Sequence, residues 1–172
     1  MPWAAEAIFY DLQETGHLSR VVVRLGVALG LAAIIGWERE SEGKRAGLRT
    51  HMMVALGAAL FIIVPLEAGN RADLAGGVQT EHITRVIQGI VAGIGFLGAG
   101  TILQLREQRE VRGLTTAASI WLTAAVGMSS GAGWLWPAVA GTFFALVILF
   151  ALQGAERWIR PHKPRPPEPP SA

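Results

Sequence analysis

Residues 86–105, VIQGIVAGIGFLGAGTILQL, form a run of twenty residues with no charged side chain and five glycines. In water, each glycine in a helix interior costs about 0.5–1 kcal/mol relative to alanine. A bilayer offers the backbone no hydrogen-bond partner outside the helix, so helices persist there despite glycine. A helix of about 20 residues also rises about 30 Å, the thickness of the hydrocarbon core. The run is therefore predicted to be a transmembrane helix.

The glycines of this run predict close contacts with neighbouring helices. At about 100° per residue they fall on two roughly opposite faces of the helix. Small residues on a helix face allow a second helix to approach closely. Two further glycines lie in the first apolar run of the chain. The predicted packing residues are Gly89, Gly93 and Gly100 on one face, Gly95 and Gly98 on the other, and Gly26 and Gly30 in the first run.

Positions 93–98, GIGFLG, also satisfy G-x-G-x-x-G, the fingerprint of dinucleotide-binding domains. That fingerprint requires a preceding strand, a following helix and an acidic residue about 20 positions further on. None of these features is evident, and no P-loop lysine followed by Ser or Thr occurs. We therefore expect no nucleotide and no other cofactor.

The composition agrees with a membrane protein. Only 16% of the 172 residues are charged, whereas a soluble domain has about 25%. The absence of cysteine excludes disulfides, iron–sulfur clusters and thiolate zinc sites. The net charge of +2 arises from basic residues spread over several loops rather than gathered in one patch. No nucleic-acid partner is therefore expected.

Five apolar runs predict an all-α fold, a polytopic membrane helix bundle with about five transmembrane helices. The second and fourth runs are short for a crossing, and a re-entrant fourth segment is the alternative. Residues 1–20 are expected to form a periplasmic or interfacial segment without a signal peptide, residues 21–152 the membrane domain, and residues 153–172 a proline-rich cytoplasmic tail. The runs are residues 21–37, 52–66, 86–105, 114–128 and 134–152.

The basic residues predict the orientation of the bundle. Eleven of the fifteen Lys and Arg residues lie in the first loop, the third loop and the carboxyl tail. By the positive-inside rule these segments are cytoplasmic, which places the amino terminus outside and the carboxyl terminus in the cytoplasm. The eleven are Arg39, Lys44, Arg45, Arg49, Arg106, Arg109, Arg112, Arg157, Arg160, Lys163 and Arg165.

A polar stretch, GWERESEGKRAGLRTH at residues 36–51, joins the first two runs. Glu38 and Arg39 lie where the first helix is expected to leave the bilayer, and Arg49 and Thr50 where the second enters it. One interpretation is interfacial anchoring with solvated ion pairs, each worth about 0–1 kcal/mol. The other is a polar cluster that closes the cytoplasmic mouth of the bundle.

The fourth run carries three hydroxyl groups on one helical face, those of Thr116, Ser119 and Thr123. Such hydroxyls either form hydrogen bonds between packed helices or line a polar crevice. Packing requires no ligand, whereas a crevice implies a path for a polar solute. The sequence leaves both interpretations open.

Three further polar residues lie near the predicted outer side. Arg24 is inside the first run and must reach the interface, pair with an acceptor or face water. Arg85 and Gln88 share a helical face at the start of the third run. Each is either an interfacial anchor or part of a polar functional site.

No predicted span interior contains Asp, Glu, Lys or His. Ion paths normally need oxygen ligands or titratable groups at depth, so a metal site would have to use Glu38 or loop carboxylates, and none is expected. The four histidines show no ligand spacing, and no hydrolase nucleophile motif occurs. We therefore predict no catalytic residue and no enzymatic activity.

Three blocks of sequence make the chain resemble the MgtC/SapB family of bacterial inner-membrane proteins. They are GWERE with AGLRTH and MVALGAALF, then TRVIQGIVAGIGFLGAGTIL, then VRGLTTAASIWLTAAVGMSSGAG. The likeness covers roughly residues 20–150 and implies a multi-pass protein of the inner membrane. The polar positions that match are Glu38, Arg39, Arg49, Thr50, Arg85, Arg112, Thr115, Thr116 and Trp121.

The resemblance implies a role in growth under magnesium limitation and in survival of pathogens inside macrophages. The MgtC branch is thought to regulate other membrane proteins, including the F-type ATP synthase, rather than to carry magnesium. MgtC-type members have a soluble domain after the last span, where this chain has the proline-rich tail. Members also often have an aspartate at the position of His82, so Glu81 is expected to be the acidic partner of Arg85.

The leading hypothesis is a non-enzymatic regulator that binds other membrane proteins, or itself as a homo-oligomer, through helix contacts in the lipid bilayer. The alternative is a small transporter or channel for divalent cations or other ions, with its path along the three hydroxyls and its gate at Glu38 and Arg39. An enzyme acting on lipid or phosphate esters would lack a recognisable nucleophile. The candidate polar cluster is Glu38, Arg39, Arg49, Thr50, Arg85, Gln88, Arg112, Thr115 and Thr116.

Overall fold

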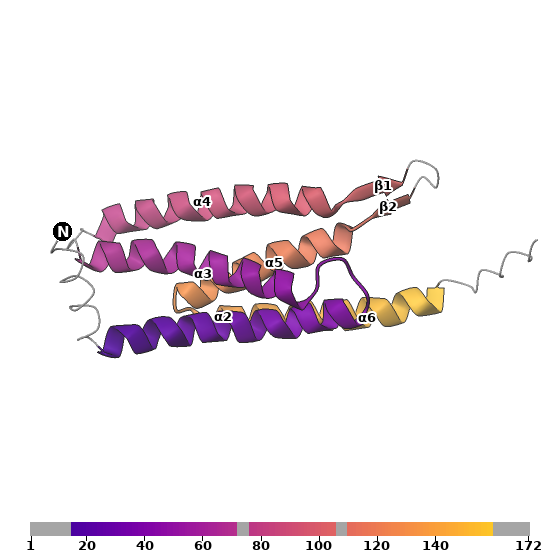
Figure 1. The fold of residues 1–172 in the computed structure, drawn as a ribbon, viewed down its shortest axis with the longest axis horizontal. Helices are drawn as coiled ribbons and strands as arrows, with labels where there is room; N and C mark the ends of the chain where they lie inside the picture. Colours follow the sequence, from indigo (N-terminus) through magenta and orange to yellow (C-terminus); the bar gives the residue numbers. More distant parts are fainter. Residues whose placement is uncertain (1–14, 72–75, 106–109, 160–172) are drawn as a thin grey trace, which may run out of the picture.

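The computed structural model describes residues 15–71, 76–105 and 110–159. In this part of the chain, five helices run alternately in opposite directions along one axis, and a short antiparallel ribbon joins two of them (Figure 1). The elements are α2 (Thr15–Ser41), α3 (Leu48–Arg71), α4 (Gly76–Thr101), β1 (Leu103–Leu105), β2 (Glu110–Arg112), α5 (Leu114–Gly131) and α6 (Leu135–Ile159).

The predicted all-α membrane bundle is confirmed, since each of the five apolar runs falls on a helix of its own. α2, α3 and α4 contain segments long and apolar enough to cross a membrane, His17–Ser41, Leu48–Ala68 and Glu81–Thr101. α6 contains a shorter apolar stretch, Leu135–Ala151. The orientation stays a prediction. So do the segment limits at residues 20 and 152, which fall inside α2 and α6, while residues 1–14 and 160–172 lie outside the described residues.

The prediction for the third run was wrong at its carboxyl end, because α4 stops at Thr101 and residues 103–105 form strand β1. The Thr101 hydroxyl donates to the carbonyl of Gly98 at 2.7 Å, within the last turn of the helix. Gly113 reverses the chain after β2 with φ of 98°, and a Cβ on it would overlap the carbonyl oxygen of Thr101. The apolar character of residues 102–105 therefore reflects the ribbon rather than a longer span.

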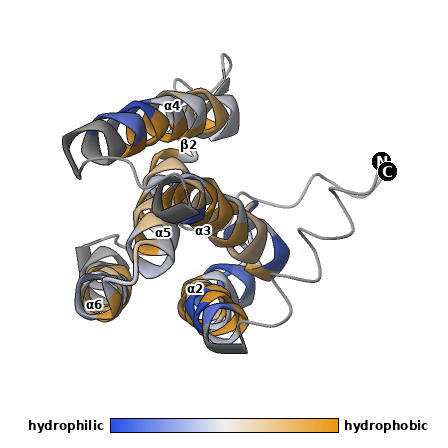
Figure 2. Ribbon diagram, turned by 90° about the vertical axis from the view of Figure 1, so that its left-hand side faces the viewer, coloured by the Kyte–Doolittle hydropathy of each residue, from blue (hydrophilic) through white to orange (hydrophobic). Residues whose placement is uncertain are grey.

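α5 is the central helix. It contacts α2, α3, α4 and α6, and the view along the bundle places it among the other helices (Figure 2). Small or hydroxyl-bearing residues recur on it every four positions, at Ser119, Thr123, Gly127 and Gly131, and all four are buried. Each of the two hydroxyls donates to a carbonyl of its own helix, at 2.8–2.9 Å. α5 therefore presents a narrow surface that its neighbours can approach closely.

The closest approach is between α3 and α5, which run parallel (Figure 1). A Cβ on Gly127 would lie 2.8 Å from the Cα of Ala55, and a Cβ on Gly131 would lie 2.8 Å from the Cα of Ala59. Both alanines are fully buried, in one cluster with alanines of α2. The backbones of the two helices therefore touch along two successive turns.

The packing glycines predicted from the sequence have different surroundings. Of that set, Gly98 has a neighbour in the described residues, since its Cβ would lie 3.6 Å from the Cβ of Ala117. The closer contacts are at Gly127, Gly131 and Gly36, which the prediction missed. A contact of the remaining glycines with a second molecule stays a prediction. A Cβ would meet nothing described within 4 Å at Gly26, Gly30, Gly89, Gly93, Gly95 and Gly100.

We expect Gly127→Ala to lower the free energy of unfolding by about 1–3 kcal/mol, because the added methyl group meets the backbone of Ala55, which cannot rotate away. Gly26→Ala is the matched control, since it adds the same group to a helix where the space is open. That control should be neutral or stabilising by up to about 1 kcal/mol. Thermal unfolding in mild detergent, followed by circular dichroism, compares the two. Equal melting temperatures would contradict the close contact.

Candidate functional site

The polar stretch between the first two helices folds into a tight hairpin. The carboxylate of Glu40 accepts a hydrogen bond from the backbone N–H of Leu48 at 2.8 Å and so caps the first turn of α3. Gly43 turns the chain with φ of 65°. Gly36 lets α3 start against α2, because a Cβ there would lie 2.7 Å from the Cα of Leu48. Glu40, Gly43 and Gly36 therefore shape this turn.

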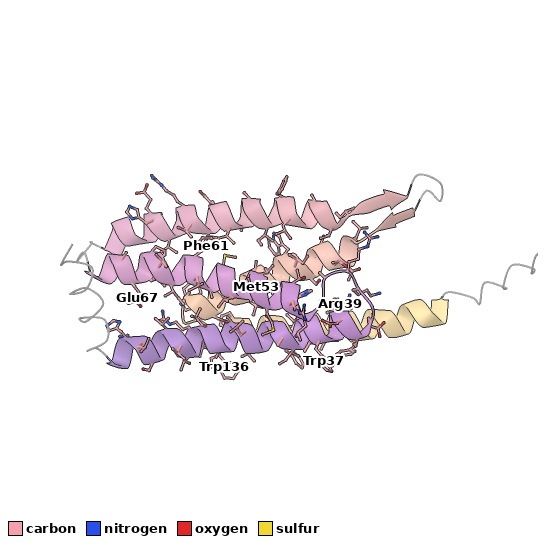
Figure 3. All side chains as sticks on the ribbon, viewed as in Figure 1. Trp37, Arg39, Met53, Phe61, Glu67 and Trp136 are labelled. Atoms are coloured by element: carbon pink, nitrogen blue, oxygen red, sulfur yellow. The ribbon has the colours of Figure 1, made fainter. Side chains whose placement is uncertain are left out.

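Glu38 and Arg39 form a buried ion pair at this end of the bundle (Figure 3). Glu38 is 4% exposed and Arg39 is 1% exposed. Arg39 Nη2 donates to Glu38 Oε1 at 2.5 Å, and Arg39 Nε donates to the other oxygen of the same carboxylate. Two-point contacts of this kind are among the strongest hydrogen-bonded pairs in proteins. The pair therefore belongs to the interior and is not a solvated anchor.

His51 joins the start of α3 to α5. The imidazole is fully buried; Nδ1 lies 2.8 Å from the carbonyl oxygen of Gly47, and Nε2 lies 3.1 Å from the hydroxyl oxygen of Ser119. The same hydroxyl lies 2.9 Å from the carbonyl oxygen of Thr116. A continuous chain of hydrogen bonds therefore connects the hairpin turn to the central helix.

The partners of His51 determine where its protons lie. A carbonyl oxygen only accepts, so Nδ1 carries a hydrogen that it donates to Gly47. In the neutral ring Nε2 accepts a hydrogen bond from the Ser119 hydroxyl, which then no longer donates to the Thr116 carbonyl. In the imidazolium ring Nε2 donates to Ser119, and the hydroxyl donates onward to Thr116. The network therefore has two complete arrangements of the ring and hydroxyl that differ by one proton.

The structure brings the predicted cluster together only in part. Thr116 is buried on α5, whereas Arg49 and Thr115 are exposed and Thr50 is half-buried. The backbone of Arg112 lies in β2 at this same end, and its side chain is outside the described part of the structure.

Arg85 and Gln88 lie on α4 toward the opposite end of the bundle, and both are exposed. Arg85 donates to Glu81 one turn earlier, with side chains 73% and 61% exposed. Glu81 is therefore the acidic partner of Arg85, as expected from the sequence. An exposed pair of this kind contributes about 0–1 kcal/mol, so it does not extend the buried cluster.

Arg24 is half-buried near that opposite end, and its guanidinium donates to the carbonyl oxygen of Gly131 at 3.2 Å. Of the three possibilities for an arginine inside an apolar run, pairing with an acceptor is the one observed. The acceptor is a backbone group at the end of α5, which no side-chain pattern could indicate.

Prediction from sequence missed His51 as part of the site. It stands one residue before an apolar run, where a histidine is easily taken for an interfacial residue. Its burial depends on Gly36, because a Cβ on that glycine would lie 3.1 Å from the His51 Cβ, and on the small surface of α5. Among the described residues, no group of three or more His, Cys, Asp or Glu could hold a metal ion.

Arg39→Gln is expected to lower the free energy of unfolding by about 3–5 kcal/mol, because it leaves the Glu38 carboxylate buried without its ion partner. Arg85→Gln removes the same group from an exposed pair and should cost less than about 1 kcal/mol. Glu38→Gln combined with Arg39→Gln should recover part of the loss, since no buried charge remains. Thermal unfolding of the three variants in one detergent measures these differences. Equal losses for the two single variants would contradict the burial of the pair.

Comparison with known proteins bears on this arrangement of helices. The model of the MgtC family matches residues 25–158, which include the hairpin, the buried ion pair and the whole of α5. Protein SrpB of Synechococcus elongatus is 42% identical over 146 residues, covering 80% of this chain and 78% of SrpB. No solved structure gives a significant match.

Two other relatives are matched over a smaller share of their own length. "Putative magnesium transporter YhiD" of Escherichia coli is 41% identical over 132 residues, covering 74% of this chain and 58% of YhiD. Protein MgtC of Brucella abortus is 41% identical over 131 residues, covering 76% of this chain and 50% of that protein. With the family model matching most of its helices, this membrane protein belongs to the MgtC family.

Proposed function

We propose that this protein is a non-enzymatic regulator of the inner membrane that acts through helix–helix contacts with other membrane proteins or with a second copy of itself. The observation that carries the proposal is an apolar groove of about 560 Å³ between α3 and α4. It is lined by Met53, Val54, Gly57, Ala58, Phe61, Val86, Gly89, Ile90, Gly93, Ile94 and Leu97.

The position of α4 supports this role. α4 lies to one side of the other helices (Figures 1 and 2), and its apolar segment is the least buried of the three candidate spans. Phe96 on α4 is 85% exposed, and Phe61 on the facing side of α3 is also exposed (Figure 3). In a bilayer such residues contact either lipid or another helix.

The residues that line the groove suit a helix better than an ion. None of them is charged, so an ion would find no ligand among their side chains. Gly57, Gly89 and Gly93 leave the backbone open to close approach, which is what drives association of apolar helices in lipid. A partner helix with small or branched apolar residues fits this surface.

The name of one relative, "Putative magnesium transporter YhiD", supports a role in magnesium physiology. We propose that the contact made by α4 regulates a membrane protein during magnesium limitation or a change in membrane energetics. The chain spans about half of Brucella MgtC and somewhat more of YhiD, so activities of those whole proteins are proposals for this chain.

Gly89→Leu combined with Gly93→Leu is expected to abolish association, because the two side chains fill the groove. A photo-reactive amino acid at Phe96 would report the contact in native membranes, by crosslinking to a second copy or to another membrane protein. We expect the crosslinked product to fall at least several-fold in the double leucine variant.

The matched control is Gly26→Leu combined with Gly30→Leu, which adds the same two side chains four residues apart on α2, where space is also open. This control should keep the crosslink, and thermal unfolding should show that both variants fold. Unchanged crosslinking in the α4 variant, with unchanged oligomer size in detergent, would reject the groove as the contact surface.

A second function is favoured by one observation, the burial of the Glu38–Arg39 ion pair and of His51 toward the same end of the bundle. Charged and titratable groups at the end of a membrane bundle are typical of ion pathways, and the name of YhiD points the same way. Against it, the Thr123 hydroxyl bonds to its own helix, the Ser119 hydroxyl is engaged by His51 and the Thr116 carbonyl, and the apolar groove offers no polar path.

Flux measurements separate the two functions. We expect vesicles that contain only this protein to show no flux of magnesium, potassium or protons above empty vesicles. A flux that falls in Glu38→Gln but persists in the exposed-pair variant Glu81→Gln would establish transport and reject the regulator proposal.

A further inference from the structure

A second pocket lies at the end of the bundle opposite the buried ion pair, where α2 passes the turn between α5 and α6. It has a volume of about 270 Å³ and is unlike the α3–α4 groove, because two arginines and a serine line it. The lining residues are Ser19, Arg20, Val23, Arg24, Gly133 and Leu135.

The α5–α6 turn holds Arg24 in a defined position. The turn closes with hydrogen bonds from Trp134 N to Ser129 O at 2.8 Å and from Gly133 N to Ser130 O at 3.0 Å, the pattern of a Schellman motif. Gly133 has φ of 82°, and a Cβ on it would lie 3.1 Å from Arg24 Nη2. The absence of a side chain at this position therefore makes room for the guanidinium.

The guanidinium of Arg24 has donors left for a ligand. An arginine carries five N–H groups. Within the described residues, Arg24 makes one hydrogen bond, from Nη1 to the carbonyl oxygen of Gly131 at 3.2 Å. That bond orients the planar group toward the pocket, and the geometry of an arginine suits two oxygens of a phosphate.

The other residues of the pocket favour an anion. Arg20 lies one turn before Arg24 on α2 and lines the same pocket, as does the hydroxyl of Ser19. None of the lining residues is acidic. Glu67 lies on α3 at this end of the bundle, and its Oε2 is 3.2 Å from Nδ1 of His17. The described lining of the pocket therefore contains two basic side chains and no acidic one.

The level of the pocket along the bundle matches a membrane surface. The α5–α6 turn is set back from the ends of α2, α3 and α4 (Figure 1). Arg24, which donates to Gly131 before this turn, is the tenth residue of α2 and so lies beyond the first turn of its helix. Next to Gly133, Trp134 is 68% exposed and Trp136 is 82% exposed. Exposed tryptophans of this kind are enriched at the boundary between hydrocarbon and headgroups.

We propose that this pocket binds the phosphate group of an anionic phospholipid. Arg24, with its unused N–H groups, and Arg20 donate to the phosphate oxygens, and Val23 and Leu135 contact the apolar part of the lipid beside them. Basic pockets between membrane helices are suited to such headgroups. Free inorganic phosphate carries the same chemistry, so the experiment must distinguish the two sources.

The test uses the full chain in phosphatidylcholine vesicles, with Trp134 and Trp136 kept and the other tryptophans replaced by phenylalanine. A brominated lipid quenches the fluorescence of tryptophans that it contacts. We expect brominated phosphatidylglycerol to quench more strongly than brominated phosphatidylcholine at the same mole fraction, with a preference of about fivefold for each arginine that faces the phosphate. The preference should fall as salt is raised.

Arg20→Gln combined with Arg24→Gln should remove the preference, and Arg20→Gln alone should reduce it if the double variant does not fold. Arg45→Gln is the matched control, since it removes the same charge from the exposed loop at the opposite end and should leave the preference unchanged. Equal quenching by the two lipids, or a preference that survives in the arginine variants, would overturn the proposal. A fluorescence response to inorganic phosphate in pure phosphatidylcholine vesicles, without a lipid preference, would reject the lipid and assign the pocket to free phosphate.

Discussion

The backbone contact between α3 and α5 is the constraint on which the rest of the bundle depends. Gly127 and Gly131 allow Ala55 and Ala59 to approach without an intervening side chain, and α2 packs against the same alanines. Lipid provides no hydrophobic force to bring helices together, so close van der Waals contact of this kind must hold them. It also sets the distance at which His51 of α3 reaches Ser119 of α5, and so the polar network is a consequence of the same small residues.

The polar network and the apolar groove lie on different sides of α3, and they suit different tasks. The ion pair of Glu38 and Arg39 is enclosed, and none of its buried side-chain nitrogen and oxygen atoms lacks a hydrogen-bond partner, which favours a structural role. The groove toward α4 is open and uncharged, which favours association. The regulator proposed above would need both a rigid core and one incompletely packed helix, and α4 is the least buried of the three candidate spans.

Much of this architecture could be predicted from sequence because hydropathy is a local property. The five apolar runs located five helices, and the partner of Arg85 followed from helical spacing alone. Contacts between helices could not be predicted in the same way. Gly127 and Gly131 form a small-residue pair as plain as Gly89 and Gly93, and only the arrangement of the helices shows that the first pair packs within the chain. His51 was missed for a related reason, since its burial depends on Gly36 and Ser119, far apart in the sequence.

The connections at the two ends of α4 bear on how a partner helix would reach the groove between α3 and α4. Four residues join α3 to α4 at one end, and at the other end the β1–β2 ribbon leads from α4 to α5, where Gly113 lies against Thr101. Among the described residues, the groove is lined by those of α3 and α4 alone, and both helices contain candidate membrane spans. The partner of the proposed regulator would therefore be a helix that is itself embedded in lipid.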